Sequence, residues 1–194
     1  AVRPVTKWSY RLTHPAELPA AIHEAVRQTS TGRPRPVEIE IPPDILSAET
    51  DLEMIEPEVY PRPLPDPKAV RDAAELLAEA RRPLIWVGGG VNLSGASQEL
   101  EQVAGLLNAP VVTTPEGQGA LPQTHPLLIG SMNYSWGPGR DLVPRADVVL
   151  AVGTRFGSHR RDATETLMHP QKLINLNVDE TEFGKSYPVD VGLA

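Results

Sequence analysis

Short, continuous apolar runs alternate with helix-like patterns through residues 67–194, and this alternation constrains the fold more than any other feature of the chain. Continuous apolar runs are typical of strands that are buried on both faces of a parallel sheet. Five such strands are predicted, at residues 84–87, 110–114, 148–152, 173–177 and 189–191. Right-handed crossovers between them predict an α/β fold, a doubly wound, mostly parallel, Rossmann-like sheet of about five or six strands with helices on both faces.

Proline and acidic residues are concentrated just before this body. Nine of the 21 prolines fall between residues 34 and 67, and residues 44–66 carry a net charge of −6, against −7 for the whole chain. Because proline lacks an amide hydrogen and fixes φ, the run Pro-Arg-Pro-Leu-Pro-Asp-Pro at 61–67 cannot form a helix or an inner strand. We expect residues 44–66 to be an extended, solvated linker, with an interaction tail as the alternative. The chain is thereby divided into residues 1–43, 44–66 and 67–194.

The first 43 residues carry too little predicted structure for a domain of their own. Pro19 marks a helix start, and Ile22 and Val26 follow one turn apart on an apolar stripe. Residues 37–41 alternate strictly and predict one half-buried strand. One helix and one strand cannot enclose a core, so this helix–strand extension is predicted to be the end of another domain. Its exposed apolar surface favours self-association.

A glycine-rich loop follows the first predicted strand of the body, where open parallel sheets bind their ligands. Gly88, Gly89 and Gly90 are followed by Asn92 and by a helix predicted to start near Ser94. Glycine amides at a helix N-terminus can hold a phosphate. A tight strand-to-helix turn that requires glycine explains the same residues, so both interpretations remain open.

Gly153, Thr154 and Arg155 follow the strand at residues 148–152. Arg155 can pair with a pyrophosphate and Thr154 can donate a hydrogen bond to it. The basic cluster that Arg155 forms with Arg160 and Arg161 suits one small anionic ligand. The alternative is a surface arginine beside a glycine turn.

Asn177 and Asp179 follow the strand at residues 173–177. An acid at a strand end commonly holds a ribose hydroxyl, which suggests that role for Asp179. Asp179 and Glu182 also form an ordinary capping arrangement for a helix that would run to Lys185. One residue can serve in both roles.

Composition excludes several kinds of site. The absence of cysteine rules out disulfides, a zinc ribbon and a thiol nucleophile, and a pI near 5.2 argues against nucleic-acid binding. The longest apolar run has five residues, against the ~20 that cross a bilayer, and no signal peptide is visible, so we expect a soluble, cytoplasmic protein. His14, His125 and His169 each precede proline, which is typical of turns. Neither a metal site nor a catalytic residue is predicted.

Six stretches, taken in order, resemble the thiamine-diphosphate-dependent enzymes of the acetolactate synthase type. They are Val-Thr-Lys-Trp at 5–8, Arg-Pro-Arg-Pro-Val-Glu-Ile-Glu-Ile-Pro-Pro-Asp at 33–44, Arg-Pro-Leu-Ile-Trp-Val-Gly-Gly-Gly at 82–90, Pro-Val-Val-Thr-Thr at 110–114 with Gly117 and Gly119, Ala-Asp-Val-Val-Leu-Ala-Val-Gly-Thr-Arg-Phe at 146–156, and Ile-Asn-Leu-Asn-Val-Asp at 174–179 with Glu182, Gly184 and Lys185. The resemblance covers essentially the whole chain.

This resemblance implies a place within a larger enzyme. In the family a pyrimidine-binding, a central and a pyrophosphate-binding domain follow one another. Residues 1–43 resemble the end of the first domain and residues 67–194 nearly all of the second. The family's catalytic glutamate and its magnesium-holding Gly-Asp-Gly…Asn motif fall outside these residues. We therefore expect this chain to be the non-catalytic central domain of a thiamine-diphosphate- and Mg-dependent enzyme. That enzyme would be a 2-oxo acid decarboxylase or carboligase, which is a lyase or a transferase. The chain would be inactive alone, and its partners would be the missing domains in a homo-oligomer.

The resemblance also implies a nucleotide site, because in some family members the central domain binds FAD or ADP. By motif, the contacts would fall on Gly88, Gly89, Gly90, Asn92, Thr113, Thr114, Gly153, Thr154, Arg155, Asn177 and Asp179. Two stretches depart from the acetolactate synthase pattern: Gly-Ser-His-Arg-Arg replaces the usual Asp-Asp-Arg at 157–161, and residues 129–137 match the flavin-side loop loosely. A structural scaffold or dimerisation domain, and a stand-alone adenine-nucleotide-binding domain, are the alternatives.

Overall fold

The computed structural model describes residues 2–131, 139–156 and 171–194. The chain forms two compact units, residues 1–63 (unit 1) and residues 64–194 (unit 2). Unit 1 contains a two-stranded sheet and unit 2 a six-stranded sheet.

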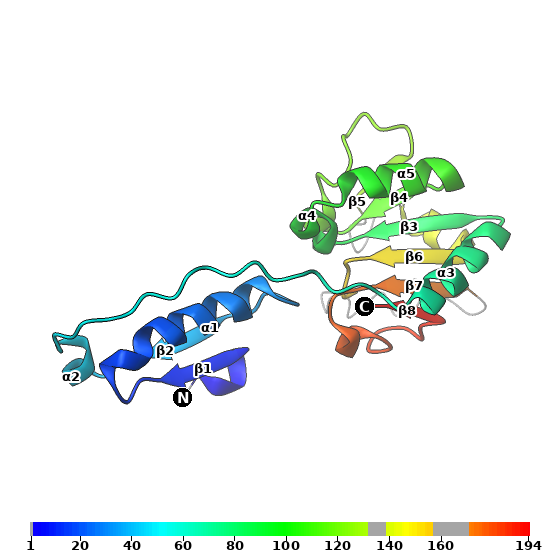
Figure 1. The fold of residues 1–194 in the computed structure, drawn as a ribbon. Coiled ribbons are helices and arrows are strands. Elements are labelled where there is room, and N and C mark those ends of the chain that lie inside the picture. Colours follow the sequence, from blue (N-terminus) through cyan, green and yellow to red (C-terminus); the bar gives the residue numbers. More distant parts are fainter. Residues whose placement is uncertain (1, 132–138, 157–170) are drawn as a thin grey trace. The chain divides into compact units, whose positions relative to one another are not determined.

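Unit 2 is built on parallel strands (Figure 1). In chain order they are β3 (Pro83–Val87), β4 (Val111–Thr113), β5 (Leu128–Ser131), β6 (Val148–Val152), β7 (Lys172–Leu176) and β8 (Val191–Leu193). Their order in the sheet is β5-β4-β3-β6-β7-β8, and every neighbouring pair is parallel. The chain therefore winds outward from β3 in one direction and from β6 in the other, which confirms the predicted doubly wound, Rossmann-like topology.

Two strands at the margins of this sheet differ from the sequence prediction. β5 has no counterpart among the predicted strands, because it is a half-buried edge strand that includes Gly130 and shifts register against β4. β8 begins two residues later than predicted. Asp190 lies before it in a loop, where its carboxylate accepts the N–H of Leu173 at 2.9 Å and pairs with Lys172 Nζ at 2.7 Å.

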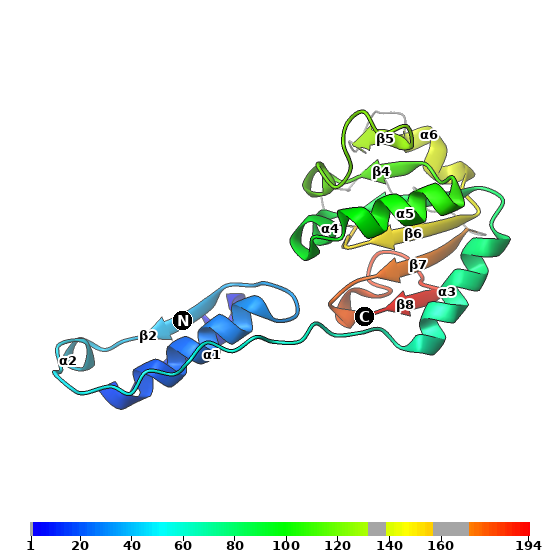
Figure 2. The ribbon, with the colours of Figure 1, turned by 45° about the horizontal axis from the view of Figure 1, so that its top comes forward.

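Helices cover both faces of the sheet, as Figure 2 shows. On one face α3 (Pro67–Glu79), α4 (Gly89–Ser94) and α5 (Ser97–Leu107) enclose a buried core that includes Ala73 and Leu100. On the other face α6 (Gly139–Leu142) and the 3-10 turn Val143–Arg145 flank a second core around Trp86. The Asp66-Pro67 start signal is confirmed, because the Asp66 carboxylate accepts the N–H of Lys68 at 3.0 Å and caps α3.

Unit 1 pairs two parallel strands, joined through a helix. β1 (Trp8–Arg11) pairs with β2 (Val37–Glu40), and α1 (Leu18–Ser30) lies between them in the chain. The prediction of a single strand within residues 1–43 is therefore wrong. β1 is only four residues long and ends in exposed residues, so it carries no continuous apolar signal.

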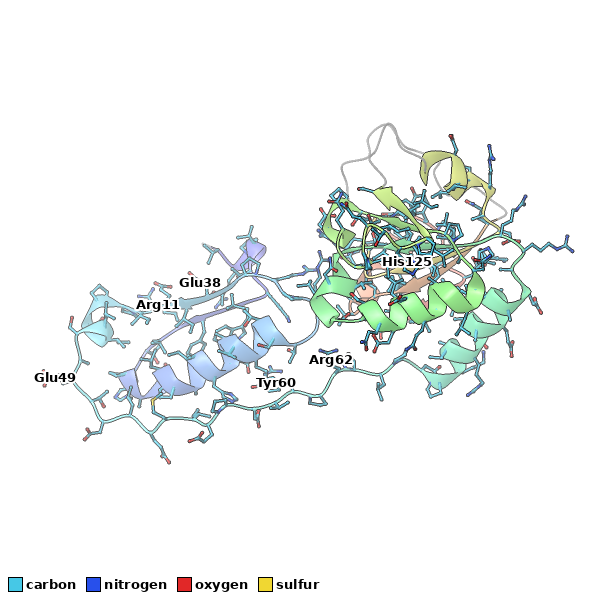
Figure 3. All side chains as sticks on the ribbon, turned by 90° about the horizontal axis from the view of Figure 1, so that it is seen from above. Arg11, Glu38, Glu49, Tyr60, Arg62 and His125 are labelled. Atoms are coloured by element: carbon cyan, nitrogen blue, oxygen red, sulfur yellow. The ribbon has the colours of Figure 1, made fainter. Side chains whose placement is uncertain are left out.

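One face of this small sheet is polar. Ser9 Oγ donates to the Glu38 carboxylate at 2.6 Å, and Arg11 pairs with Glu40 at 3.0 Å; Arg11 and Glu38 are labelled in Figure 3. Two 3-10 turns, Arg3–Val5 and Pro15–Glu17, precede β1 and α1.

Residues 47–66 contain neither helix nor strand. At its start α2 (Pro43–Leu46) forms one short helical turn. Among the residues that the structure describes, no helix is both long and apolar enough to span a membrane.

Candidate functional site

The sequence-predicted site residues gather at one edge of the six-stranded sheet. The loops that carry them follow β4, β3, β6 and β7, which are neighbours in that order. Because the strands are parallel, their carboxyl ends share an edge. The strand order reverses between β3 and β6, and the edge beside such a reversal is where open α/β sheets bind ligands.

The glycine loop after β3 interlocks with the loop after β6. The N–H of Gly88 donates to Val152 O at 2.8 Å, and the N–H of Gly90 donates to Gly153 O at 3.0 Å. A Cβ atom added to Gly88 would lie 2.3 Å from Gly153 O, and one added to Gly90 would lie 2.6 Å from Gly153 Cα. Backbone packing therefore requires these glycines, which supports the tight-turn interpretation.

The helix after this loop starts earlier than predicted. Gly88 is the N-cap of α4, and Gly89 is its first residue, whereas the sequence indicates a start near Ser94. Gly95, at φ +69°, ends α4, and a separate helix begins at Ser97. The early start leaves the N–H of Gly89 in a first turn, where an α-helix offers no acceptor four residues earlier.

Asn92 ties the loop after β4 to this glycine loop, and Thr114 stabilises the loop after β4 from within. Asn92 Nδ2 donates to Glu116 O and Gln118 O, both at 3.0 Å. Thr114 Oγ1 accepts the N–H of Gly117 at 3.2 Å, and the neighbouring Thr113 is buried. The polar groups of these side chains therefore hold backbone in place.

Gly117 belongs to the same interlock, although the sequence indicates no site role for it. A Cβ atom on Gly117 would lie 2.4 Å from Val87 O. The signal in the sequence is the Thr-Pro-Glu-Gly turn at 114–117, directly after a buried strand.

The loop after β6 turns sharply at two positions. Gly153 has φ +62° and Phe156 has φ +53°, a left-handed conformation that costs a bulky side chain roughly 1–2 kcal/mol. Thr154 Oγ1 accepts the N–H of Phe156 at 3.2 Å. The Phe156 ring lies edge-on to Trp86, with centroids 5.1 Å apart, and to Tyr187 at 5.0 Å. The sequence signal for this anchor is weak, since a lone phenylalanine after a glycine turn is common.

Arg155 is exposed in this loop, between buried Thr154 and buried Phe156. Its predicted companions Arg160 and Arg161 lie outside the described residues, as do residues 157–159 and the 132–137 part of the loosely matching loop.

The loop after β7 is fastened to the same edge. Asn177 is buried, its Nδ2 donates to Thr154 O at 3.0 Å, and its Oδ1 accepts the N–H of Asp179 at 3.1 Å. Asp179 Oδ1 accepts the N–H of Thr181 at 3.2 Å, so Asp179 is the N-cap of the turn that follows. The predicted helix to Lys185 is wrong. Only the 3-10 turn Glu180–Glu182 forms, because Phe183 is extended and Gly184 has φ +77°.

Taken together, these contacts divide the predicted site residues into two groups. Asn92, Thr114, Thr154 and Asn177 use their side-chain polar groups to hold loops together. The first-turn N–H of Gly89, the exposed guanidinium of Arg155 and the carboxylate of Asp179, which also accepts from Thr181, follow three neighbouring strands at this edge. An N–H, a guanidinium and a carboxylate suit a phosphate with a ribose hydroxyl, so the edge is compatible with a nucleotide.

Two of the histidines that precede proline stabilise turns, as predicted. His14 Nδ1 accepts the N–H of Ala16, and His125 Nδ1 accepts the N–H of Leu127, both at 3.2 Å. His125, labelled in Figure 3, also has its Nε2 3.8 Å from Glu101. His169 lies outside the described residues. Within the described ranges, no three His, Asp or Glu side chains come together in a way that could hold a metal ion.

A shallow hollow of about 490 Å³ lies away from the predicted residues. It is lined by Ser97, Gln98, Glu101 and residues 119–123, at the first turns of α5. None of the predicted site residues lines it.

Comparisons with known proteins agree with the resemblance seen in the sequence. Residues 70–194 match the family described as "Thiamine pyrophosphate enzyme, central domain". The chain is 34% identical, over 97% of its length, to a protein named probable acetolactate synthase large subunit from Methanocaldococcus jannaschii. It is 33% identical over 97% to the acetolactate synthase large subunit of Corynebacterium glutamicum, and 29% identical over 98% to the glyoxylate carboligase of Escherichia coli O157:H7.

The chain spans about a third of the length of these curated relatives. It is also similar to a solved structure described as a thiamin diphosphate-dependent enzyme from Mycobacterium smegmatis, with a TM-score of 0.79 and 25% sequence identity. That match covers 99% of this chain and 37% of the solved one. The chain therefore belongs to the thiamine pyrophosphate enzyme family, and its residues 70–194 form the family's central domain.

Proposed function

We propose that this chain is the non-catalytic central part of a larger thiamine-diphosphate- and Mg-dependent enzyme that decarboxylates or ligates 2-oxo acids, as acetolactate synthase does. The observation that carries the proposal is a match over 97% of this chain that covers only about a third of each relative. We assign residues 1–43 to the end of a pyrimidine-binding domain, residues 44–66 to a linker and residues 67–194 to the central domain. The partners would be the remaining domains of the enzyme, in a homo-oligomer.

The residues that the structure describes in this chain bring together no cluster of carboxylates or histidines suited to the magnesium ion that accompanies thiamine diphosphate. The structural part of this proposal is supported by two buried cores, one on each face of the central sheet, which suit a domain that spaces its neighbours. A cytoplasmic location remains a prediction from the sequence.

Calorimetry tests this proposal. Titration of thiamine diphosphate with Mg²⁺ into the 194-residue chain should give no binding heat, whereas the full-length protein should bind the pair and release CO₂ from a 2-oxo acid such as pyruvate. Tight binding by this chain alone would contradict the claim that the catalytic site is built elsewhere. Failure of the full-length protein to act on any 2-oxo acid would contradict the substrate class.

We propose, second, that the carboxyl edge of the sheet holds FAD or ADP. The specific observation in favour is that Gly89 and Arg155 follow β3 and β6, between which the strand order reverses, and that Asp179 follows the neighbouring strand β7. When bound, FAD would supply a redox-active ring and ADP a purely structural anchor. In this chain Gly89 N–H and Arg155 would hold the phosphates, and Asp179 would hold a ribose hydroxyl, while Asn92 and Asn177 fix the loops that carry them.

A thermal-shift series with FAD, ADP, NAD and coenzyme A tests the nucleotide site. One of these ligands should raise the melting temperature of the chain. Arg155→Ala should weaken the apparent affinity for that ligand at least tenfold. The control Arg71→Ala, which removes an exposed arginine from α3, should leave the affinity unchanged. The absence of any shift at millimolar ligand would favour the scaffold or dimerisation alternative. A stand-alone nucleotide-binding domain would instead bind its ligand and show no association with the other domains.

A further inference from the structure

One polar atom in the second core of unit 2 receives no hydrogen bond from the residues that the structure describes. Asn175 lies in β7 and is 1% exposed, and its Oδ1 has no donor among them. Leu173, two residues earlier, belongs to the core around Trp86, and side chains two apart on a strand share a face. Asn175 therefore points into that core. Buried amide oxygens are nearly always bonded, to protein or to ordered water, so this oxygen requires a donor.

The neighbours of Asn175 in the sheet are small. Its register partners are Ala151 of β6 on one side and Gly192 of β8 on the other, on strands that Figure 1 labels. A Cβ atom added to Gly192 would lie 2.7 Å from Cε2 of Phe183, so the Phe183 ring fills the β8 side. The β6 side carries only the methyl group of Ala151. Space for a small molecule beside Oδ1 is therefore on the Ala151 side.

Aromatic rings cover that side of the face. Trp86 of β3 is the other register partner of Ala151. Its ring lies 5.1 Å from the ring of Phe156, which lies 5.0 Å from the ring of Tyr187. Neighbouring strands are about 4.8 Å apart, so two such steps match the separation of β3 and β7. The rings therefore extend from β3 across β6, over Ala151. Because Ala151 and Phe156 are both buried, a donor at this point is enclosed by protein, which favours a very small molecule.

We infer that Asn175 Oδ1 accepts a hydrogen bond from one internal water molecule, held over Ala151 beneath the Phe156 ring. A neutral molecule is favoured over an ammonium or metal ion, because the buried polar residues of the described chain include no acid to balance a buried positive charge. Water has a second O–H and two lone pairs for backbone groups of the loop above, where a carbonyl can accept two hydrogen bonds. Internal waters typically satisfy polar groups of this kind. The inference does not rest on the proposed function.

Magnetic relaxation dispersion of water oxygen-17 tests this inference, because its amplitude counts the water molecules that stay buried in a protein. We would compare the 194-residue chain with Asn175→Leu, which keeps a branched side chain and removes the amide. The amplitude should fall by the equivalent of one water molecule. The control Gln102→Leu removes an exposed amide from α5 and should leave the amplitude unchanged. Equal amplitudes in the parent and in Asn175→Leu would overturn the inference.

A second measurement needs no variant, so it also applies if circular dichroism shows that Asn175→Leu does not fold. In the nitrogen-15-labelled parent chain, nuclear Overhauser effects are recorded between water and the side-chain amide protons of Asn175. A water molecule held beside the amide should give a cross-peak with the sign of a long-lived contact. The exposed amide of Gln102 should meet only rapidly exchanging water. The absence of a long-lived contact at Asn175 would contradict the assignment.

Discussion

Units 1 and 2 are both parallel α/β structures, but they differ in how completely their strands are covered. In unit 2, β3 and β6 have strand neighbours on both sides, and Ile85, Val87 and Val149 are fully buried. In the described part of unit 1 the buried apolar side chains are Leu12 and Ala21, whereas Ile22 and Val26 of α1 are about half exposed. Parallel strands therefore bury their apolar side chains completely only where other strands flank them and helices cover both faces of the sheet. For this reason we expect unit 2 to be more stable than unit 1.

The strongest way to break this comparison is to disrupt the interlock in unit 2. Gly88→Ala places a Cβ 2.3 Å from Gly153 O, which is backbone and cannot move aside cheaply. We expect a loss of about 3 kcal/mol or more in the free energy of unfolding of unit 2, because the two loops must separate. Urea titration followed by circular dichroism measures it.

Gly105→Ala is the matched control on α5. An added Cβ there meets nothing within 4 Å, and alanine favours the helix by about 1 kcal/mol, so this variant should stabilise unit 2. If Gly88→Ala and Gly105→Ala change the free energy of unfolding equally, the close backbone contact of Gly88 is not the reason that glycine is required there.

A second, smaller effect concerns the opposite edge of the same sheet. Asp147 accepts the N–H groups of Arg81 and Arg82, both at 2.9 Å. Burial alone would raise the pKa of Asp147, but these backbone hydrogen bonds hold it below the usual value. We expect Asp147→Asn to cost unit 2 about 2 kcal/mol at pH 7, because the neutral amide accepts with only one oxygen.

The contribution of Asp147 should depend on pH in a defined direction. A carboxyl group with a lowered pKa stabilises the folded state above its unfolded value of about 3.8, and this contribution is lost as the pH falls through the lower folded value. The stability difference between parent and Asp147→Asn should therefore shrink below about pH 4. A difference that persists undiminished at pH 2 would contradict the assignment.

Unit 1 is expected to depend on polar contacts at its ends. Lys7 Nζ donates to Gln28 O at 2.6 Å and Thr31 O at 2.7 Å, at the C-terminus of α1. Lys7→Met should cost unit 1 about 1 kcal/mol and leave unit 2 unchanged, since the charge also complements the helix dipole. Amide hydrogen exchange of α1 reports the loss. The control Arg11→Met removes an exposed ion pair with Glu40 and should lower the stability of unit 1 by less than about 0.5 kcal/mol. Equal losses of stability in Lys7→Met and Arg11→Met would contradict the larger role expected for Lys7.

The smallest effect is the titration of one carboxyl group in α1. Hydrogen bonds from Arg27 and Gln28 lower the pKa of Glu24 to about 2. Carboxyl NMR of the full chain should show Glu24 titrating well below the usual value of 4.5 for a glutamate, and its contribution to stability should persist until the pH falls towards 2. A midpoint near 4.5 would mean that these contacts do not form in solution.

The sequence predicted the centre of the sheet better than its margins. β3 and β6 are continuous apolar runs because both faces are covered, and both lie within a residue of their predicted positions. β1 and β5 escaped prediction because edge strands are half solvated and carry mixed side chains. The helix expected after Asp179 did not form because Phe183 is extended and Gly184 takes a left-handed conformation, a stop signal that the prediction of a helix to Lys185 overlooked.

The candidate site divides in the same way. Local patterns located the loops after β3, β6 and β7, because glycine, arginine and acidic residues follow apolar runs there. Which atoms face a ligand did not follow from those patterns. Asn92 binds the carbonyls of Glu116 and Gln118, and Asn177 binds that of Thr154, over sequence separations of more than 20 residues.

By itself, the sequence determined the parallel α/β body, the proline-rich acidic segment and membership of the thiamine pyrophosphate enzyme family, because periodicity and local motifs depend on near neighbours in the chain. Only the tertiary structure decided that Gly88, Gly90 and Gly153 pack against one another and that Tyr60 contacts His23. These are contacts between distant residues, and a Cβ clash or a hydrogen bond exists only once the fold has brought both partners together.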